Sequence, residues 1–401
     1  MTERKVFNQD QPPSYAGRGL REALTVLIFV ETSREFGRGL LHGIARYSRL
    51  HGHWRIYQRP VALDSSLPDW RDMKIDGAIA RDVRVAQGLV HAGFPVVFVQ
   101  HSRDLYEHFP CLVTDGQSIS NMCAEHLLER GFKNFAFCGY DDFIWSRNRC
   151  RFFTEYISKA GHQAFVYSQP RSASKRLWKN EQYVLAEWLK GLPKPVALMA
   201  CNDDRALQVV EACKLAGLAV PEDVAVIGVD NDPIVCELAD PPISSIALTT
   251  EAAGYAAAEL LDRLMHGEPM AGQRIMVYPT RVVARVSTDI TAVTDPEVAA
   301  AVCYIREHAD RPIQVADVVR ATAVSRRVLE NRFRTALRRS IHQEIQRVRV
   351  NHIMQLLVDT DLSVKEIARR SGFDSPGHIA RYFRRVTGVS LREYRHRYTA
   401  R

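Results

Sequence analysis

Short apolar blocks separated by polar stretches run through residues 24 to 288. The first block, Leu24 to Val30, is almost continuously apolar, which is typical of a parallel strand buried on both faces. Similar blocks predict further strands at Trp54–Tyr57, Asp76–Ala80, Pro95–Val99, Phe135–Cys138, Val196–Ala200, Val224–Val229 and Ile275–Tyr278.

Between these blocks, apolar positions recur at the spacing of a helix. Helices are predicted at Gly37–Arg49, Ser118–Arg130, Tyr183–Leu189, Arg205–Ala216 and Glu251–Met265. The alternation of strand and helix predicts parallel α/β sheets with right-handed crossovers, and the length of this part favours two lobes. Ligands of such sheets bind beyond the carboxyl ends of the strands.

Near the C-terminus the pattern changes to two short helices joined by a turn. Ser363 and Glu366 form an S-x-x-E capping box that begins the first helix, and Gly372 can take the positive φ that ends it. Ser375 and Pro376 then supply an N-cap and a first helical residue for the second helix. The pair is a helix-turn-helix, whose second helix has the width of a DNA major groove.

An ordinary helical hairpin with solvated arginines would explain one such pair, but a second copy lies upstream. Ser325, Leu329 and Phe333 correspond to Ser375, Ile379 and Phe383 at a constant offset of fifty positions. Apolar residues at near-helical spacing between the copies predict a linker helix through Ile341, Ile345, Val348, Ile353 and Leu356. Two helix-turn-helix units on one connector can address successive major grooves, about 34 Å apart.

The charge of the chain is concentrated in this C-terminal part. Residues 297–401 hold 21 Lys and Arg against 11 Asp and Glu, a net charge of +10, whereas the rest of the chain holds 33 against 35. Arginine and lysine side chains that neutralise phosphates release counterions, so this part should bind DNA with a steep salt dependence.

The cysteines and the N-terminal residues indicate in which cellular compartment the protein is expected. The eight cysteines show neither a C-x-x-C spacing nor a zinc-ligand pattern with histidine, as expected for small buried residues in a reducing compartment. Residues 1–22 read as a flexible tail without the apolar core of a signal peptide, and no apolar run approaches a membrane span. We therefore expect a cytoplasmic protein that needs no cofactor or metal and does not contact a membrane.

Polar side chains follow several of the predicted strands and are candidates for ligand contact. Asn202 and Asp203 follow one strand, Asp230 and Asn231 the next, and Gln100 an earlier one. Asx residues at strand ends also cap the following helix, and we expect that role for Asp203 and Asn231. For Asn202 and Asp230 as a pair we expect ligand contact.

Residues 24–288 resemble the two-lobed sugar-sensing domain of the LacI and GalR family and of type I periplasmic binding proteins. The stretches that carry the resemblance are DGAIA (76–80), AEHLLERGFKNFAFCG (124–139), ACNDDRAL (200–207), VPEDVAVIGVDND (220–232) and PPISSIALTTEAAGYAAAELLDRL (241–264). The resemblance implies sugar contacts from Gln100, Arg149, Asn202 and Asp230, with Ser33 to Arg38 at the edge of the cleft. The family's N-terminal DNA-binding helices do not precede the first strand here.

Two further residues join the ligand-binding candidates. Arg38 ends the cleft-edge segment, and Trp145 could supply an aromatic face for the apolar side of a sugar ring or fill the space between the lobes.

The C-terminal hundred residues resemble the AraC-type DNA-binding domain. Its signature is an I-A-x-x-x-G-F turn followed by a basic helix and a closing G-x-[ST]-P-x-x-Y-R, matched here by Ile367, Ala368, Gly372, Phe373, Phe383, Gly388, Ser390, Tyr394 and Arg395. Leu391 stands in place of the proline, Ile379 in place of a common phenylalanine, and Ala323 at the glycine-type turn of the first copy.

The resemblance implies which side chains meet DNA. Base contacts are expected from Arg327, Glu330, Asn331, His378 and Arg381, and phosphate contacts from Arg326, Arg384, Arg385 and Arg395. For the arginines of the second helix, contact with bases and contact with the DNA backbone are equally expected. Gly377 has no side chain to read with, so the second copy should read fewer bases than the first.

Together these patterns predict an α/β two-lobed, periplasmic-binding-protein-like (type I) domain followed by an all-α domain with two helix-turn-helix motifs. Residues 23–288 form the ligand-binding domain, with lobe 1 at about 23–110 and 244–270 and lobe 2 at about 111–243 and 271–288. A linker at 289–299 leads to the DNA-binding domain at 300–401.

This order of domains resembles that of a group of xylose-responsive transcription regulators. The resemblance implies a homodimer that binds a double-stranded DNA operator, D-xylose or a related aldose, and RNA polymerase. It further implies activation of pentose-utilisation genes, with lobe closure repositioning the DNA-binding domain. A regulator of another carbohydrate pathway, a sugar-binding module and a carbohydrate-binding enzyme are the alternatives. The chain lacks the P-loop, G-x-S-x-G, H-E-x-x-H and G-x-G-x-x-G motifs, which speaks against the enzyme.

Overall fold

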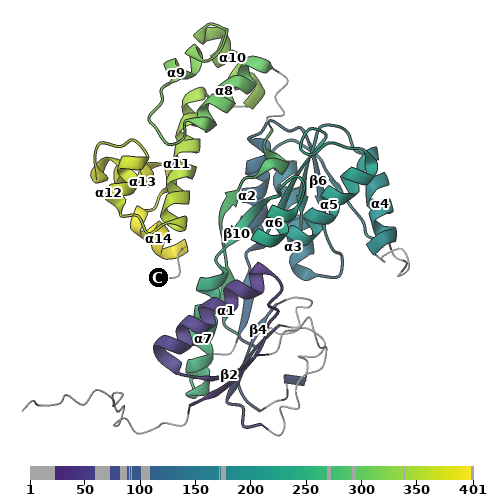
Figure 1. The fold of residues 1–401 in the computed structure, drawn as a ribbon, viewed down its shortest axis with the longest axis vertical. Helices are drawn as coiled ribbons and strands as arrows, with labels where there is room; N and C mark the ends of the chain where they lie inside the picture. The colour runs from purple at the N-terminus through teal and green to yellow at the C-terminus, as the bar shows by residue number, and fades with distance from the viewer. Residues whose placement is uncertain are drawn as a thin grey trace, which may run out of the picture.

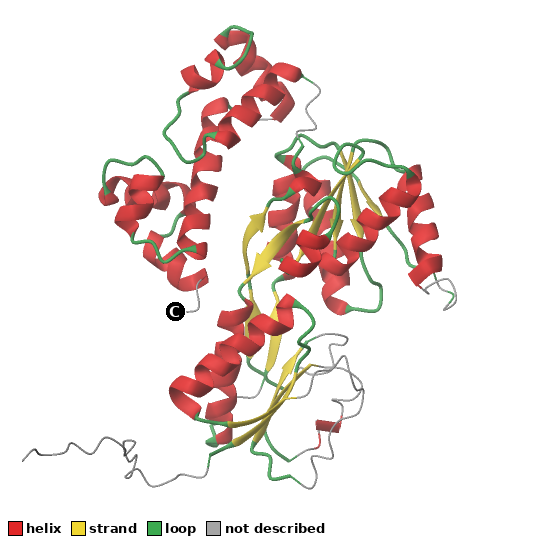
Figure 2. Ribbon diagram, in the orientation of Figure 1, coloured by secondary structure: helices red, strands yellow, loops and turns green. Residues whose placement is uncertain are grey.

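The fold consists of two α/β lobes and a helical domain, shown in Figures 1 and 2. The structure is a computed structural model that describes residues 23–58, 73–81, 88–89, 91, 93–100, 109–170, 172, 178–268, 272–290, 295–337 and 339–398. The predicted tail at 1–22 lies outside these residues, as does the 291–294 part of the predicted linker.

Lobe 1 is built on a six-stranded sheet in the order β11-β5-β4-β3-β1-β2. Its strands are β1 (Thr25–Phe29), β2 (Arg55–Gln58), β3 (Gly77–Arg81), β4 (Val96–Val99), β5 (Cys111–Thr114) and β11 (Arg274–Val277), all paired in parallel. Helices α1 (Glu35–Tyr47) and α7 (Thr250–Met265) lie side by side on this lobe (Figure 1). A Cβ on Gly43 would clash with the carbonyl oxygen of Glu251, so glycine lets the two helix backbones approach closely.

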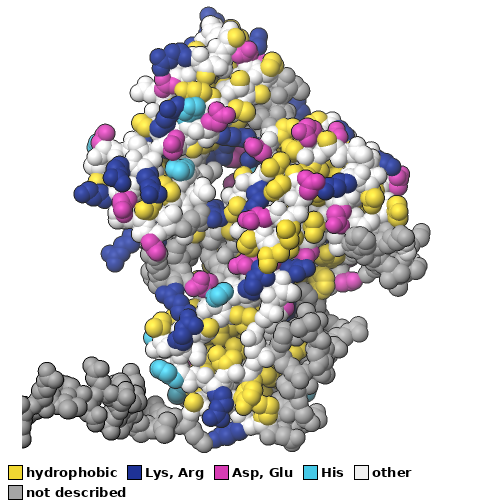
Figure 3. Space-filling model, in the orientation of Figure 1, with side chains coloured by type: hydrophobic (Ala, Val, Ile, Leu, Met, Phe, Trp, Pro, Cys, Tyr) yellow, Lys and Arg dark blue, Asp and Glu magenta, His cyan; other side chains and the backbone are white. Residues whose placement is uncertain are grey.

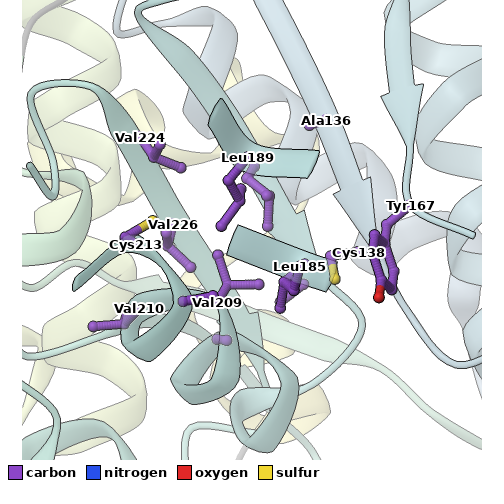
Figure 4. Close-up of a cluster of buried hydrophobic side chains, with 14 of the residues drawn as sticks. Ala136, Cys138, Tyr167, Leu185, Leu189, Val209, Val210, Cys213, Val224 and Val226 are labelled. Atoms are coloured by element: carbon purple, nitrogen blue, oxygen red, sulfur yellow. The ribbon is translucent and has the colours of Figure 1, made fainter. Parts of the chain in front are cut away.

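Lobe 2 is built on a second six-stranded sheet in the order β12-β10-β9-β8-β6-β7. Its strands are β6 (Asn134–Cys138), β7 (Ala164–Val166), β8 (Val196–Ala200), β9 (Val224–Val229), β10 (Ser244–Leu248) and β12 (Pro279–Val283), of which β12 is antiparallel to β10. Its helices are α2 (Gly116–Leu128), α3 (Ile144–Lys159), α4 (Trp178–Gly191), α5 (Asp203–Ala216) and α6 (Pro233–Leu238). Aliphatic side chains of α4, α5, β8 and β9 form one of its two cores (Figure 4).

The lobe boundaries differ from those that the sequence predicts. Strands β5 and β11 belong to the sheet of lobe 1, and β10 belongs to that of lobe 2, whereas the sequence placed each in the opposite lobe. The chain therefore crosses between the lobes at 114–116, 248–250 and 277–279. The sequence predicted β11 as a strand but neither β5 nor β10. Hydrophobic periodicity also does not show with which neighbour a strand pairs, so it could not assign these strands to a lobe.

The helical domain consists of two helix-turn-helix units on one connecting helix. Its helices are α8 (Pro296–Glu307), α9 (Val315–Arg320), α10 (Arg326–Leu337), α11 (Ile341–Asp359), α12 (Val364–Arg370), α13 (Pro376–Thr387) and α14 (Leu391–Tyr398). It begins earlier than the predicted residue 300, because Asp295 caps α8. One apolar core joins α8–α10 to the first half of α11, and another joins α12–α14 to its second half.

Local capping signals in the second unit are confirmed. The side chain of Ser363 accepts a hydrogen bond from the Glu366 amide while the Glu366 carboxylate accepts one from the Ser363 amide. Gly372 has a φ of +67°, and the Ser375 side chain caps α13.

Arg395, which the sequence analysis expected to contact phosphate, has a structural role in the helical domain. Its guanidinium donates to the carbonyl oxygens of Leu357 and Leu362 and holds α14 against α11.

Candidate functional site

A cavity of about 470 Å³ lies between the two lobes. Lobe 1 contributes the ends of β1, β3, β4 and β5 and the start of α1. Lobe 2 contributes the loops that follow β6, β8 and β9 and the first halves of α3 and α5. Predicted ligand residues that line it are Gln100, Trp145, Arg149, Asn202 and Asp230. Ser33, Arg34 and Phe36 of the predicted cleft edge also line it. Lining residues that the sequence analysis did not name are Glu31, Arg81, Thr114, Tyr140, Phe143, Asp204 and Gln208.

Arg149 and Asp230 form the polar centre of the cavity. The Arg149 side chain is 3% exposed, and its Nη2 lies 3.9 Å from Oδ1 of Asp230. Nη1 of Arg149 donates to the Cys201 carbonyl, but the described residues offer no hydrogen-bond partner to its Nε or to Oδ1 of Asp230. Burial raises the pKa of Asp230 to about 6, against the lowering effect of Arg149. Buried polar atoms without partners are costly, and a ligand with hydroxyl groups would satisfy them.

An aromatic wall lies beside this polar centre. The rings of Phe143 and Trp145 are stacked, with centroids 5.5 Å apart and planes 11° apart. The Arg149 guanidinium lies 5.1 Å from the centroid of the Trp145 ring, which fixes the orientation of both side chains. Aromatic faces next to hydrogen-bonding groups match the two kinds of surface on a sugar ring.

The polar strand-end residues divide their roles differently from the prediction. Asn202, expected to contact ligand, caps α5 by accepting from the Arg205 amide at 3.0 Å and also lines the cavity. Asp203, expected to be a cap, is buried and accepts hydrogen bonds from the Asp232 amide and the Ser245 hydroxyl. The cap of α6 is Asp232 and not Asn231, which takes a φ of +52°. Asn202-Asp203 and Asp230-Asn231-Asp232 each place more than one side-chain oxygen near the start of the following helix. The sequence therefore does not show which of these residues caps the helix.

Arg38 does not line the cavity, unlike the other predicted ligand residues. Its Nη2 lies 3.0 Å from Oδ2 of Asp232 and 3.1 Å from Oε2 of Glu35. It therefore joins α1 of lobe 1 to the loop after β9 in lobe 2. Its partner Asp232 is 194 positions away in the chain, so the spacing of the two residues could not predict this contact.

Asp232 links the lobes through both carboxylate oxygens. Oδ1 accepts from the amide of Ile234 at the start of α6, and Oδ2 accepts from the amide of Glu35 at the start of α1. A second link pairs Arg34 with Asp204 at 2.8 Å. These contacts hold the lobes together over the cavity.

The predicted DNA-contacting side chains lie on the surface of α10 and α13. Arg326, Arg327 and Asn331 on α10 are exposed, and Glu330 is half-buried and pairs with Arg326 at 2.8 Å. On α13, His378, Arg381, Arg384 and Arg385 are exposed, while Ile379 and Phe383 are buried beneath them. Figure 3 shows Lys and Arg side chains along the outer edge of the helical domain.

Sequence comparison identifies close relatives over nearly the whole chain. The chain is 31% identical over 379 residues to the xylose operon regulatory protein of Haemophilus influenzae, covering 92% of this chain and 97% of that protein. The chain belongs to the family of xylose operon regulatory proteins. The Escherichia coli K12 member is 32% identical over 386 residues, or 94% of this chain and 97% of its own.

Further comparisons agree with this assignment. Residues 124–288 match a periplasmic binding protein-like domain, and residues 318–397 match a helix-turn-helix domain. The solved structure of the xylose-binding transcription activator xylR is 30% identical and covers 94% of this chain and 98% of its own, with a TM-score of 0.59. The predicted two-domain fold and the prediction of a DNA-binding transcription regulator, as opposed to an enzyme, are thus confirmed.

The described residues contain neither a membrane-spanning helix nor a cluster of metal-binding side chains. None of their helices is long and apolar enough to cross a bilayer. In the same part of the chain, His, Cys, Asp and Glu side chains nowhere gather in a group of three or more that could hold a metal ion.

Proposed function

We propose that this regulator binds D-xylose or a closely related aldose in the cavity between its lobes and activates pentose-utilisation genes. The observation that carries the proposal is the Arg149–Asp230 pair, which lines a cavity with an aromatic wall. Nε of Arg149 and Oδ1 of Asp230 have no hydrogen-bond partner among the described residues. Two relatives are xylose operon regulators by name, and the solved relative is a xylose-binding activator.

Isothermal titration calorimetry with a panel of pentoses and hexoses tests the ligand. D-xylose or a close aldose should give saturable one-site binding, with other sugars weaker. Heats no larger than those of dilution for every sugar would refute the proposal.

Lobe closure is the proposed response to sugar. A ligand that contacts Gln100 from lobe 1 and Asp230 from lobe 2 binds the closed arrangement better than an open one. It can shift the population only by that difference in affinity. The pairs Arg34–Asp204 and Arg38–Asp232 would then add to the stability of the closed lobes.

The contact between lobe 2 and α11 is the proposed route from the sugar to the helical domain. Arg347 on α11 pairs with Glu129 at the end of α2 and with Glu344, which is fully buried. Arg339 donates to the Glu129 carbonyl at 2.9 Å, and the Tyr394 hydroxyl donates to the carbonyl of Thr280 on β12. A movement of lobe 2 would therefore be transmitted to both helix-turn-helix units through one rigid helix.

Replacing Glu129 by glutamine should weaken this transmission. The loss of one partner from this partly buried ion pair leaves Arg347 less firmly held, so the effect of xylose on operator affinity should fall about fivefold or more. Xylose affinity should stay within about twofold of wild type, since Glu129 lies outside the cavity. Fluorescence anisotropy with labelled operator DNA measures the first quantity and calorimetry the second.

The matched control is Glu125→Gln on the same helix. Glu125 is exposed and accepts from the Tyr156 hydroxyl, within lobe 2. Equal effects of the two substitutions on the sugar response would contradict a specific role for Glu129.

Sugar binding should depend on pH through Asp230. Burial raises its pKa to about 6, and sugar hydroxyls that donate to the carboxylate favour its ionised form. The pKa should therefore fall on binding, and affinity should be constant above about pH 7 and decline as the pH drops through 6. Calorimetry from pH 8 to 5 would show this decline, and Asp230→Asn should remove it. A flat profile in the wild type would mean that the carboxylate does not accept from the ligand.

The remaining partners are part of the same proposal. We propose a cytoplasmic homodimer that occupies paired half-sites in operator DNA and contacts RNA polymerase. Two helix-turn-helix units per chain give each protomer two successive major grooves to read.

A further inference from the structure

A second charged pair lines the cavity between the lobes, on the side of lobe 1. Glu31 follows β1 and Arg81 ends β3, and these two strands pair in parallel with Phe29 opposite Ala80. The Glu31 carboxylate and the Arg81 guanidinium form an ion pair. The pair thus lies at the carboxyl ends of neighbouring parallel strands, where sheets of this kind bind ligands.

Both members of this pair belong to the cavity wall and are not fully buried. The side chains of Glu31 and Arg81 are 12% and 15% exposed, against 3% for Arg149. The Arg81 guanidinium also lies 5.6 Å from the centroid of the ring of Phe36, another residue of the wall. A small ligand in the cavity therefore has a charged pair and an aromatic ring beside it in lobe 1 as well as in lobe 2.

Arg81 acts on Asp230, which belongs to the opposite lobe. Burial raises the pKa of Asp230 to about 6, and the positive charges of Arg149 and Arg81 act against this rise. The carboxylates of Asp204 and Asp232 add to it. Charges influence the pKa of a carboxyl group only at short range, so the charged pairs of the two lobes lie close enough to contact one small ligand.

A purely structural role explains the Glu31–Arg81 pair poorly. Taking two charges out of water costs free energy that their mutual attraction often does not exceed, so apolar side chains would join β1 and β3 equally well. Hydroxyl groups both donate and accept hydrogen bonds. A sugar can therefore donate to the carboxylate and accept from the guanidinium without bringing a charge into the cavity.

We propose that Glu31 and Arg81 are specificity-determining residues of lobe 1, which bind neighbouring hydroxyl groups of the sugar opposite the Arg149–Asp230 pair. This inference rests on the proposed function and deepens it, because the same aldose is bound from both lobes. A site that hydrogen-bonds a hydroxyl group rejects the analogue that lacks it, since polar groups of the site are then left unpaired. Lobe 1 should therefore select sugars by the hydroxyl groups on one side of the ring.

Calorimetry of the full chain with D-xylose and its monodeoxy analogues tests this assignment. Wild-type protein should bind at least one analogue that lacks a hydroxyl group facing lobe 1 about 10-fold more weakly than xylose. Arg81→Met should bind xylose about 10-fold more weakly and should no longer distinguish xylose from that analogue. Its preference for xylose over the analogues that lack a hydroxyl group facing Asp230 should remain. A residue that only stabilises lobe 1 would weaken all these sugars by the same factor.

Two further variants keep the test decisive. Glu31→Gln keeps the shape of the acceptor, and loss of the same discrimination in this variant gives an independent result if Arg81→Met folds poorly. The matched control is Arg263→Met, because Arg263 pairs with Glu268 on lobe 1 but is 46% exposed and does not line the cavity. The control should change each affinity by less than about twofold.

The outcomes separate this inference from the proposed function. If wild-type protein binds xylose and both cavity variants keep its full pattern of discrimination, the Glu31–Arg81 pair is structural and the inference is overturned, while the proposed function stands. If wild-type protein binds neither D-xylose nor a related aldose, both are overturned.

Discussion

The double substitution Arg327→Ala and Arg381→Ala should abolish operator binding while leaving sugar affinity unchanged. Both side chains are exposed on the helices that follow the turns of the two helix-turn-helix units, above the buried Leu329, Ile379 and Phe383. An arginine that contacts a guanine edge contributes about 1–3 kcal/mol, so each substitution should weaken binding about 5- to 150-fold. The two sites lie on separate units, and their effects should add.

Gel shifts with operator fragments selected from random DNA measure this loss, and calorimetry measures the sugar affinity. Alanine at Lys159 and Lys190, which are exposed on lobe 2, removes the same charge and is the matched control. If the double variant loses sugar binding as well as operator binding, the assignment of DNA binding to the helical domain and of sugar binding to the two lobes is wrong.

The single variants separate base contact from phosphate contact. Gly377 leaves α13 with fewer side chains that can contact bases. Arg327→Ala should therefore change the preferred DNA sequence more than Arg381→Ala does. A substitution that removes a phosphate contact should lower the salt slope by about 1 and weaken binding to all sequences alike.

Asp230→Asn should have the largest effect on sugar affinity of any single substitution in the cavity. It removes a charged acceptor at nearly constant shape, and hydrogen bonds to charged groups contribute about 1.5–3 kcal/mol, equivalent to about 10- to 150-fold in affinity. Its neighbour Arg149 would also lose its nearest carboxylate in the cavity. The control is Asp240→Asn, at a carboxylate that is 89% exposed and far from the cavity in lobe 2.

Folding should survive this substitution. The folded-state pKa of Asp230 is raised to about 6 from an ordinary value of 3.8, so ionising it costs folding free energy. The group favours folding below pH 3.8, and that contribution is lost as the pH rises through 6. At pH 7.5 the neutral amide should therefore leave the melting temperature unchanged or raise it. A lower melting temperature with unchanged sugar affinity would show that Asp230 is a structural residue.

The parts of the fold that follow from local chemistry could be predicted from the sequence. The capping box at Ser363 and Glu366, the turn at Gly372 and the cap at Ser375 depend only on neighbours within a few residues. Buried strands such as β8 and β9 could also be predicted, because a strand that is buried on both faces is a continuous apolar run.

Features that depend on distant partners could not be predicted. The sequence does not indicate that β10 pairs with β9 and β12, because pairing is decided by the packing of the whole lobe. Nor does it indicate that Asp232 serves two helices in two lobes, or that Glu129 meets Arg347. In the cavity, the residues missed came largely from lobe 1 and from the loop after β6, where Tyr140 and Phe143 carry no motif of their own.

The central claim is that sugar in the cavity controls DNA binding by the helical domain. Fluorescence anisotropy of labelled operator DNA, titrated with the full chain at fixed salt with and without saturating D-xylose, tests it most directly. Coupling between two sites is typically about 5- to 150-fold, so operator affinity should rise by at least about fivefold with the sugar. Asp230→Asn should need about 10- to 150-fold more xylose for the same rise. Equal operator affinity with and without sugar, in protein that calorimetry shows to be saturated with xylose, would contradict the claim.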